Sequence, residues 1–340
     1  MATIFVTGGA GFIGSAFIRF VLEETFDTKI INYDALTYAG NLENLKELDE
    51  KRHKFVKGDI RDKQAVLQAL PEKIEAVFNF AAETHVDRSI NSAEEFVTTN
   101  VLGTQILLDA ARTKNVKRFV HISTDEVMGS LPEDDTTFFT EDSPLQPNSP
   151  YAASKAAAEH LVRAAHETFG LDTIITRCGN NYGPRQFPEK LIPLIIANAI
   201  NDELLPVYGD GKNTRDWIYV EDHARVIWLT YAKGAAGGIY NIGARNERTN
   251  LEVVKSILDI LGKPHSLIKF VADRLGHDRR YAIDPTKAET ELEWKSSTPW
   301  EEGLRKTIRW YAENQNWVKQ VRSGAYRDYY KNLYGLEIKN

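Results

Sequence analysis

Short apolar runs alternate with longer amphipathic segments through the first half of the 340-residue chain. The runs are nearly continuous in Val, Ile and Phe, which is typical of strands that are covered on both faces. Such alternation predicts a doubly wound α/β fold, in which helices on both sides connect the strands of a parallel sheet. The predicted strands are 3–7, 29–33, 53–57, 76–80, 118–123 and 172–177. The principal helices predicted between them are 12–26, 93–114 and 151–169.

Gly8, Gly11 and Gly14 stand at three-residue spacing between the first predicted strand and the first predicted helix. This pattern allows a tight turn, a close approach of the backbone to a pyrophosphate, and close packing of the helix on the strand. The helix start, at Phe12 and Ile13, offers free N–H groups and a partial positive charge to an anion. We therefore predict a Rossmann-type dinucleotide site, with a glycine-rich turn that binds nothing as the alternative.

Two acidic residues follow the next strands. Asp34 ends the second predicted strand, 20 residues after Gly14. An acidic side chain there accepts hydrogen bonds from the adenosine ribose and repels a 2′-phosphate, so we predict NAD as the cofactor rather than NADP. Asp59 follows the third strand and is a predicted adenine contact. The alternatives are that Asp34 only caps a loop and that Gly58-Asp59 is only a turn.

The second half of the chain is less regular after about Gly183. Helices are predicted at 191–200, 221–232, 251–261 and 299–314, and a strand at 239–242. A length of 340 residues suits one large or two closely joined domains. We expect 1–185 to form an NAD-binding domain, to which elements around 216–245 return. We expect 186–340 to form mainly a smaller C-terminal domain that binds the substrate.

Tyr151 and Lys155 stand four residues apart in a predicted helix, so they share one of its faces. A phenol with a pKa of about 10 is a poor base at neutral pH. A neighbouring ammonium, together with a positive nicotinamide ring, favours the phenolate and lowers that pKa. We expect Tyr151 to accept a proton from a substrate hydroxyl while hydride leaves the same carbon, and Lys155 to hold the nicotinamide ribose. The alternative is a surface pair without a chemical role.

The fifth predicted strand leads directly into Thr124, Asp125 and Glu126. Two adjacent carboxyl groups beyond a strand end can acquire different pKa values through unequal burial and mutual repulsion. One of them can then act as an acid and the other as a base. The alternative is a pair of solvated carboxylates in a turn.

Composition excludes several other classes of function. Lys and Arg number 42 against 48 Asp and Glu, and a net charge of −6 gives no electrostatic reason to bind nucleic acid. The only cysteine, Cys178, excludes a disulfide framework and fits a reducing compartment. The scattered histidines show no metal-ligand spacing, so no metal site is predicted. No apolar stretch is long enough to span a membrane and no signal peptide is recognised, so we expect a cytoplasmic protein.

These motifs resemble those of the extended short-chain dehydrogenase/reductase family, in 7–14 and 151–155, and the similarity runs along nearly the whole chain. Within that family the chain is most similar to the nucleotide-sugar 4,6-dehydratases. The similar segments are Thr124-Asp125-Glu126, 34–41, 81–89, 177–184, 188–193 and 273–284. Three positions depart from the pattern, because Met128, Gly179 and Leu275 stand where the family usually has Tyr, Ser and Pro.

The resemblance implies conversion of dTDP-glucose to its 4-keto-6-deoxy form with bound NAD. Tyr151 would deprotonate the C4 hydroxyl while the C4 hydride passes to NAD, and Thr124 would bind the resulting ketone oxygen. Glu126 would then remove the C5 proton, and Asp125 would protonate the departing C6 hydroxyl as water. Hydride finally returns to C6, which regenerates NAD.

Motifs and resemblance together give two sets of binding residues. The predicted cofactor-binding residues are Gly8, Gly11, Phe12, Ile13, Gly14, Asp34, Leu36, Thr37, Asp59, Ile60, Ala81, Ala82, Thr99, Tyr151, Lys155 and Asn180. The predicted substrate-binding residues are Thr84, Arg88, Asn180, Glu189, Lys190, Leu191, Pro206, Tyr208, Arg215, Asn250, Asp273, Arg274 and His277. Among these, Arg215 and Arg274 are expected to bind the diphosphate, because a guanidinium binds phosphate oxygens in a bidentate way.

Other functions remain open on the sequence alone. A 4,6-dehydratase of CDP- or UDP-glucose, a nucleotide-sugar 4-epimerase or a decarboxylase would use much of the same site. A non-catalytic protein that senses NAD would use only its cofactor part. The resemblance also implies a homodimer, in which helices 93–114 and 151–169 form a four-helix bundle with a second copy. The alternative is that other parts of the same chain cover these helices.

Overall fold

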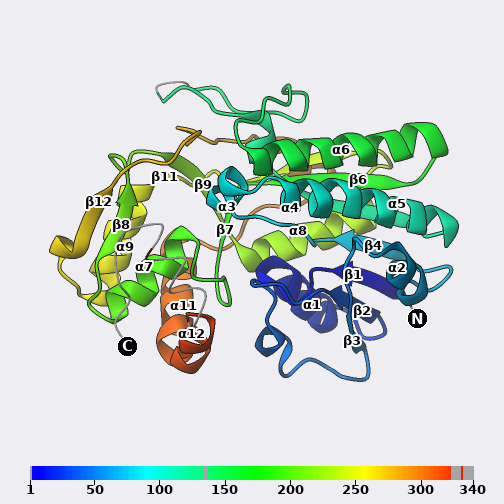
Figure 1. The fold of residues 1–340 in the computed structure, drawn as a ribbon, viewed down its shortest axis with the longest axis horizontal. Helices are drawn as coiled ribbons and strands as arrows, with labels where there is room; N and C mark the ends of the chain where they lie inside the picture. Colours follow the sequence, from blue (N-terminus) through cyan, green and yellow to red (C-terminus); the bar gives the residue numbers. More distant parts are fainter. Residues whose placement is uncertain (1, 134–135, 323–330, 332–340) are drawn as a thin grey trace.

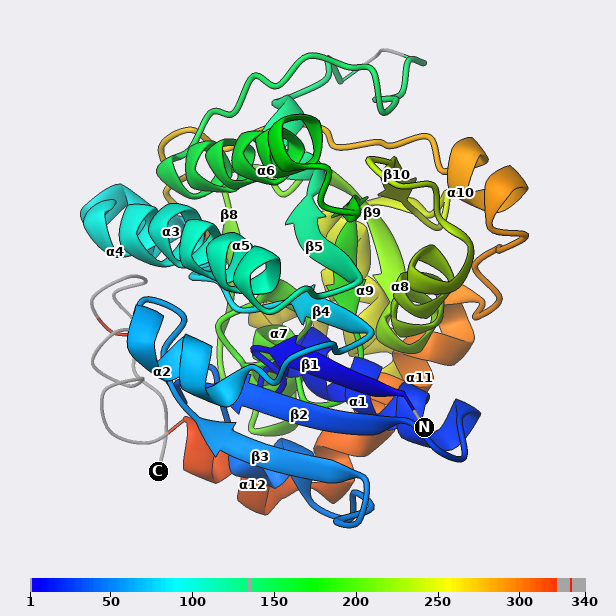
Figure 2. The ribbon, with the colours of Figure 1, turned by 90° about the vertical axis from the view of Figure 1, so that its right-hand side faces the viewer.

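The computed structural model describes residues 2–133, 136–322 and 331. Its main element is a seven-stranded sheet in the order β10-β6-β5-β4-β1-β2-β3, in which every neighbouring pair is parallel (Figures 1 and 2). The strands are β1 (Thr3–Thr7), β2 (Lys29–Asp34), β3 (His53–Lys57), β4 (Ala76–Asn79), β5 (Arg118–Thr124), β6 (Thr173–Cys178) and β10 (Ile239–Ile242). The strand order reverses between β1 and β4, as in dinucleotide-binding folds. The predicted α/β fold class is confirmed.

Helices cover both faces of this sheet because neighbouring residues of each strand point to opposite sides. Phe5 of β1 packs with α2 (Lys63–Ala69), α5 (Thr104–Thr113) and α6 (Pro150–Phe169). Ile4 and Val6 pack on the other face with α1 (Phe12–Glu24) and α8 (Val220–Lys233). Figure 2 shows the two layers on either side of the strands. The near-continuous apolar character of the strands therefore reflects burial on both faces.

The predicted helix 93–114 is helical throughout but not uniform. It consists of α4 (Glu94–Phe96), the π-helical segment η2 (Val97–Gly103) and α5. Asn100 of η2 is buried and accepts a hydrogen bond from Glu83 N at 2.9 Å. It also donates to Glu83 O at 3.0 Å and to Ser154 Oγ at 2.9 Å. These bonds join the π-helical segment to α6 and to the residues that follow β4. Contacts between such distant segments cannot be predicted from the periodicity of apolar residues.

Two small sheets lie beyond the main one. β11 (Glu247–Thr249), β9 (Thr214–Tyr219) and β7 (Asn180–Tyr182) form the first, and β12 (Ile268–Val271) and β8 (Leu205–Tyr208) form the second. Most of these strands have three or four residues, which is too short for apolar alternation to be recognised. Three helices surround an apolar core that contains Trp217 and Trp300: α7 (Leu191–Ile200), α9 (Asn250–Leu261) and α11 (Trp300–Glu313).

The remaining elements are short. They are α3 (Val86–Asn91), α10 (Thr286–Glu291), α12 (Gln315–Val321), η1 (Leu42–Leu45), η3 (Asp125–Met128) and η4 (His265–Leu267). Residues 323–330 and 332–340 of the predicted segment 186–340 lie outside the described residues. Within the described ranges, no helix combines the length and the apolar character that crossing a membrane requires.

Candidate active site

A long cleft runs along the carboxyl ends of the main strands and continues between the main sheet and the two small sheets. Gly8 follows β1, Asp34 ends β2, Thr124 ends β5 and Cys178 ends β6, and all four line the cleft. Ligands of open parallel sheets bind at this edge, next to the reversal of strand order. The topology thus gathers at one place the side chains that follow different strands.

Nearly all predicted site residues line this cleft. The exceptions are Leu36 among the predicted cofactor residues, and Arg88 and Asp273 among the predicted substrate residues. The lining residues that were predicted for catalysis are Thr124, Asp125, Glu126, Tyr151 and Lys155. Those predicted for binding are Gly8, Gly11, Phe12, Ile13, Gly14, Asp34, Thr37, Asp59, Ile60, Ala81, Ala82, Thr99, Asn180, Thr84, Glu189, Lys190, Leu191, Pro206, Tyr208, Arg215, Asn250, Arg274 and His277.

The three exceptions lie behind lining residues. The backbone N–H of Leu36 donates to Asp34 Oδ1 at 2.8 Å. The guanidinium of Arg88 lies 3.9 Å from the ring centroid of Tyr38, and its Nε is 3.7 Å from Glu189 Oε2. Asp273 accepts hydrogen bonds from the backbone N–H of Arg274 at 2.9 Å and from His277 at 2.5 Å. Each of the three thus contacts a residue that lines the cleft, and its direct contact with a ligand stays a prediction.

The glycine turn fits a dinucleotide pyrophosphate. Gly8 has a φ of +70°, and a Cβ there would lie 2.6 Å from Ala81 N, so a side chain is excluded by both strain and space. A Cβ on Gly14 would lie 2.3 Å from Gly8 O, which explains how closely α1 packs on the turn. Gly11, the N-cap of α1, provides no side-chain cap, and the first N–H groups of the helix face the cleft without one.

Asp34 is oriented by the backbone around the same turn. Its Oδ2 accepts a hydrogen bond from Ala10 N at 2.9 Å, and its Oδ1 accepts from Leu36 N. Burial raises the pKa of Asp34 above its ordinary value, and these two N–H donors oppose that rise. Such an acceptor at the end of β2 fits the hydroxyls of a ribose and disfavours a phosphate on them.

The two adjacent carboxyl groups have unlike environments. Thr124 caps η3, since its Oγ1 accepts from Glu126 N at 3.3 Å, and this turn directs Asp125 and Glu126 into the cleft. Burial, followed by the neighbouring Glu126, raises the pKa of Asp125 well above its usual range. Burial also raises the pKa of Glu126, but Arg274 and Lys190 oppose this rise. Burial and the neighbouring carboxylate thus favour a protonated Asp125, which can donate a proton, whereas Arg274 and Lys190 favour an ionised Glu126, which can accept one.

Tyr151 and Lys155 project from the first turns of α6, whose N-cap, Ser149, accepts a hydrogen bond from Ala152 N at 3.1 Å. Lys155 Nζ donates to Ile122 O at 2.6 Å, which ties the helix to β5. Burial lowers the pKa of Lys155 to about 8. Burial and Glu126 raise the pKa of Tyr151 well above its ordinary value. The predicted lowering of the Tyr151 pKa depends on the positive nicotinamide ring as well as on Lys155, and it stays a prediction for the protein with bound NAD.

Three cations of the cleft, Arg215, Lys190 and Arg274, lie close enough to Glu126 for their charges to oppose the rise of its pKa. Arg215 is buried, and its Nη2 donates to Asp278 O at 2.9 Å. Lys190 Nζ donates to Thr84 O at 2.8 Å. Arg274 Nε is buried and has no hydrogen-bond partner among the described residues. Three cations around one subsite fit a diphosphate.

Tyr281 also lines this subsite, although no sequence motif points to it. The Arg215 guanidinium stacks 4.2 Å from the centroid of its ring, and its hydroxyl donates to the Asp278 carboxylate. A tyrosine in an irregular segment has no spacing that would identify it. Its only signal was its place within 273–284, one of the segments of resemblance.

The three departures from the family pattern differ in their surroundings. Met128 is buried next to Phe139, and its sulfur lies 3.8 Å from a guanidinium nitrogen of Arg177. Gly179 lines the cleft, and a Cβ there would lie 2.8 Å from Asp216 O, so the backbone of Asp216 occupies the space that a side chain would need. Leu275 is 77% exposed. None of the three removes a side chain of the acid–base cluster.

Several known proteins are similar to this chain in sequence and in fold. A sequence model of the protein family described as GDP-mannose 4,6 dehydratase matches residues 5–307. A dTDP-glucose 4,6-dehydratase from Escherichia coli is 49% identical over 356 residues, which cover 97% of this chain and 98% of that protein. One from Xanthomonas campestris pv. campestris (strain B100) is 52% identical over 348 residues, which cover 96% of this chain and 98% of that protein.

Solved structures agree with these relatives. DesIV, a dTDP-glucose 4,6-dehydratase from Streptomyces venezuelae crystallised with NAD, matches with a TM-score of 0.91 at 49% identity, covering 94% of this chain and 99% of that one. A UDP-glucose 4-epimerase from Thermotoga maritima matches with a TM-score of 0.84 at 29% identity, covering 92% of this chain and 99% of that one. The predicted resemblance to nucleotide-sugar 4,6-dehydratases is confirmed, and the chain belongs to the GDP-mannose 4,6 dehydratase family.

Proposed function

We propose that this protein is an NAD-dependent enzyme that converts dTDP-glucose to dTDP-4-keto-6-deoxyglucose and water. The observation that carries the proposal is the placement of Asp125 and Glu126 in one cleft with Tyr151 and the glycine turn. The relatives at 49% and 52% identity are named for dTDP-glucose, whereas the family description names GDP-mannose. The choice of dTDP-glucose follows these relatives, because their similarity extends over nearly the full length of both proteins.

NAD fits the first half of the cleft. Backbone N–H groups at Gly11 and the start of α1 bind the pyrophosphate, and Asp34 binds the adenosine ribose. Bound there, NAD would supply the acceptor for the C4 hydride, the donor of that hydride to C6, and a positive charge that favours the phenolate of Tyr151. Lys155 adds a second positive charge below about pH 8, the value to which burial lowers its pKa.

The side chains of the cleft divide the proton transfers between them. Tyr151 accepts the proton of the C4 hydroxyl, and Thr124 donates a hydrogen bond to the ketone oxygen that results, which acidifies C5. Glu126 removes the C5 proton. Asp125 donates its proton to the C6 hydroxyl, the C6–O bond breaks and water leaves. A 4-epimerase needs no acid for the loss of water, so an acid at Asp125, whose pKa burial raises, favours dehydration.

The direct test is incubation of the protein and NAD with a panel of nucleotide sugars: dTDP-, CDP- and UDP-glucose and GDP-mannose. We expect dTDP-glucose to give a 4-keto product, which is detected by its absorbance in alkali, with the highest kcat/KM of the panel. Faster turnover of another nucleotide sugar would reassign the substrate. Formation of another hexose without loss of water would support the epimerase.

The choice of NAD over NADP is expected to depend on Asp34. Replacement of Asp34 with alanine removes a charged acceptor for two ribose hydroxyls, so the Kd for NAD should rise about tenfold or more. The same change removes the repulsion of a 2′-phosphate, and the preference for NAD should shrink. Isothermal titration with both dinucleotides measures this, with Asp202→Ala on the exposed α7–β8 turn as control. An unchanged preference would remove Asp34 from this role.

We also propose that two copies associate in a four-helix bundle through 93–114 (α4, η2 and α5) and α6, which lie together on one outer face (Figure 2). Val97 and Leu102 of η2 are 53% and 51% exposed on this chain, and a second copy would cover them. Leu102→Glu should convert a dimer into a monomer in light scattering. Phe26→Glu, a change at a residue 96% exposed beyond the end of α1, should leave the dimer intact. A dimer that persists in Leu102→Glu would contradict the bundle.

The two-part organisation is a proposal of the same kind. We propose that 1–185, together with α8 and β10, binds the cofactor and that 186–340 mainly binds the nucleotide sugar. β10 pairs with β6 at the edge of the main sheet, and α8 packs against α1, which supports the return of these elements to the first part.

We also propose the cytoplasm as the location of the protein, since its one cysteine is free and buried, as is usual in a reducing compartment.

A further inference from the structure

The segment 272–281 supplies Arg274, His277 and Tyr281 to the substrate side of the cleft. Its start is held by the pairing of β12 with β8, where Gly209 N donates to Val271 O at 3.1 Å. Its end is held near Arg280, which forms isolated bridges with Leu131 and Thr214. The position of the segment therefore depends on what fixes its two ends.

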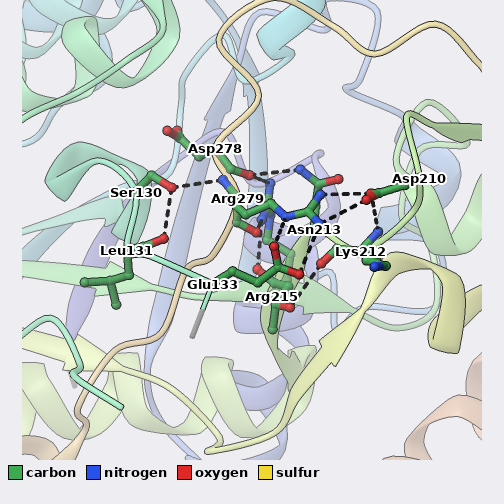
Figure 3. A network of polar contacts seen from close by, with 10 residues as sticks. Ser130, Leu131, Glu133, Asp210, Lys212, Asn213, Arg215, Asp278 and Arg279 are labelled. Carbon is green, nitrogen blue, oxygen red and sulfur yellow. Dashed lines mark hydrogen bonds and ion pairs between the residues drawn. The ribbon is translucent and has the colours of Figure 1, made fainter. Parts of the chain in front are cut away.

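The side chain of Arg279 joins this segment to two others on the outer surface (Figure 3). Its Nε and Nη2 donate to the two oxygens of Glu133 at 3.0 and 3.1 Å. Its Nη1 and Nη2 donate to the two oxygens of Asp210 at 2.8 and 3.0 Å. Glu133 follows η3, and Asp210 lies in the turn between β8 and β9. One guanidinium thus binds two carboxylates from distant parts of the chain.

The main chain of Arg279 contacts Arg215, which lines the cleft. Arg279 N donates to Ser130 Oγ at 2.9 Å, and Arg279 O accepts from Thr214 N at 2.9 Å and from Arg215 Nη1 at 3.4 Å. Asp278 O accepts from Arg215 Nη2 at 2.9 Å. The carbonyl groups of two consecutive residues therefore orient the Arg215 guanidinium, which is one of the three cations of the substrate subsite.

We propose that Arg279 is a positioning residue for the nucleotide sugar, which holds segment 272–281 and the Arg215 guanidinium in place from outside the cleft. Arg279 itself does not line the cleft. It acts through Arg215, Arg274 and His277, whose positions depend on the backbone that it anchors. The inference deepens the proposed function and rests on it, because the affected residues are those assigned to the substrate.

The geometry distinguishes this network from ordinary surface ion pairs. Isolated exposed ion pairs contribute little to stability, because water screens the charges and both side chains lose conformational freedom. Arg279 instead has both carboxylates bound in a bidentate way, and its side chain is only 30% exposed. Its hydrogen bonds lower the pKa of Asp210 and of Glu133, so both remain ionised at neutral pH. A lysine has no planar fork and cannot form the same four bonds.

The experiment compares Arg279→Gln with Arg245→Gln in the full-length protein with NAD. Arg245 is a matched control, since its Nη2 also binds two carboxylates, Asp284 and Glu289, both at 3.0 Å on the outer surface. We expect Arg279→Gln to raise the KM for dTDP-glucose about tenfold, with kcat within about twofold of the parent. The Kd for dTDP, measured by titration without turnover, should rise by the same factor. Arg245→Gln should change neither.

Two further variants separate positioning from folding. Asp210→Asn weakens the same contact from the other side and should raise KM in the same direction, and Arg279→Lys should restore only part of the affinity. Unchanged KM and Kd in Arg279→Gln, or a loss of kcat and thermal stability at constant KM, would overturn the proposal. If the parent protein fails to turn over dTDP-glucose, the proposed function fails, and the dTDP titration alone decides the role of Arg279.

Discussion

Glu126→Gln is expected to lower turnover of dTDP-glucose about a thousandfold and to abolish incorporation of solvent deuterium at C5 of the sugar. Glutamine keeps the size and shape of the side chain, but it cannot accept the C5 proton. Oxidation at C4 does not use this carboxylate and should continue. Nuclear magnetic resonance of the sugar after incubation in deuterated water measures the exchange directly.

Asp125→Asn is the matched control for this experiment, because it changes the neighbouring carboxyl in the same way. It should slow the loss of water while exchange at C5 continues through Glu126. Exchange at the parent rate in Glu126→Gln would contradict the assignment of the base. Loss of exchange in Asp125→Asn with normal exchange in Glu126→Gln would reverse the two roles.

Tyr151→Phe is expected to stop the reaction at its first step, with turnover reduced about a thousandfold or more. Phenylalanine fills nearly the same buried space but cannot accept the C4 hydroxyl proton. Because C5 becomes acidic only beside a C4 ketone, the variant should also fail to exchange the C5 hydrogen of dTDP-glucose. The measurement is turnover together with deuterium uptake from solvent, at constant thermal stability.

The 4-keto product separates the roles of Tyr151 and Glu126. Supplied as a ligand, this product already has the ketone, so its C5 hydrogen should exchange in Tyr151→Phe and should not exchange in Glu126→Gln. Normal turnover of dTDP-glucose by Tyr151→Phe would contradict its role as the base at C4. Absence of exchange with the 4-keto product in Tyr151→Phe would place the phenol in the C5 step as well.

The parts of the fold and site that could be predicted are those that a local sequence pattern specifies. The spacing of Gly8, Gly11 and Gly14 predicts a turn within seven residues, and the spacing of Tyr151 and Lys155 places both on one face of a helix. Strands buried on both faces are apolar throughout and therefore recognisable. Parallel strands end at one edge of the sheet, which is why residues that follow different strands could be assigned to one cleft before their contacts were known.

The features that were not predicted depend on contacts between distant segments. Tyr281 and Arg279 acquire their positions from Arg215, Glu133 and Asp210, which are far from them in the sequence. Asn100 in the π-helical segment η2 bonds with Glu83 and Ser154, and such contacts with distant residues leave no local pattern in the sequence. The burial of Tyr151 and Lys155 was not predicted either, since helical spacing gives proximity but not burial, which raises the pKa of Tyr151 and lowers that of Lys155.

The central claim is that one sugar ring is oxidised at C4, loses water across C5 and C6, and is reduced at C6 without leaving the cleft. The most direct test uses dTDP-glucose that has deuterium at C4, incubated with the protein and NAD in ordinary water. We predict a 4-keto-6-deoxy product with that deuterium in its C6 methyl group. A C4 epimer that has kept its C6 hydroxyl, or a product whose methyl group contains no deuterium, would contradict the account.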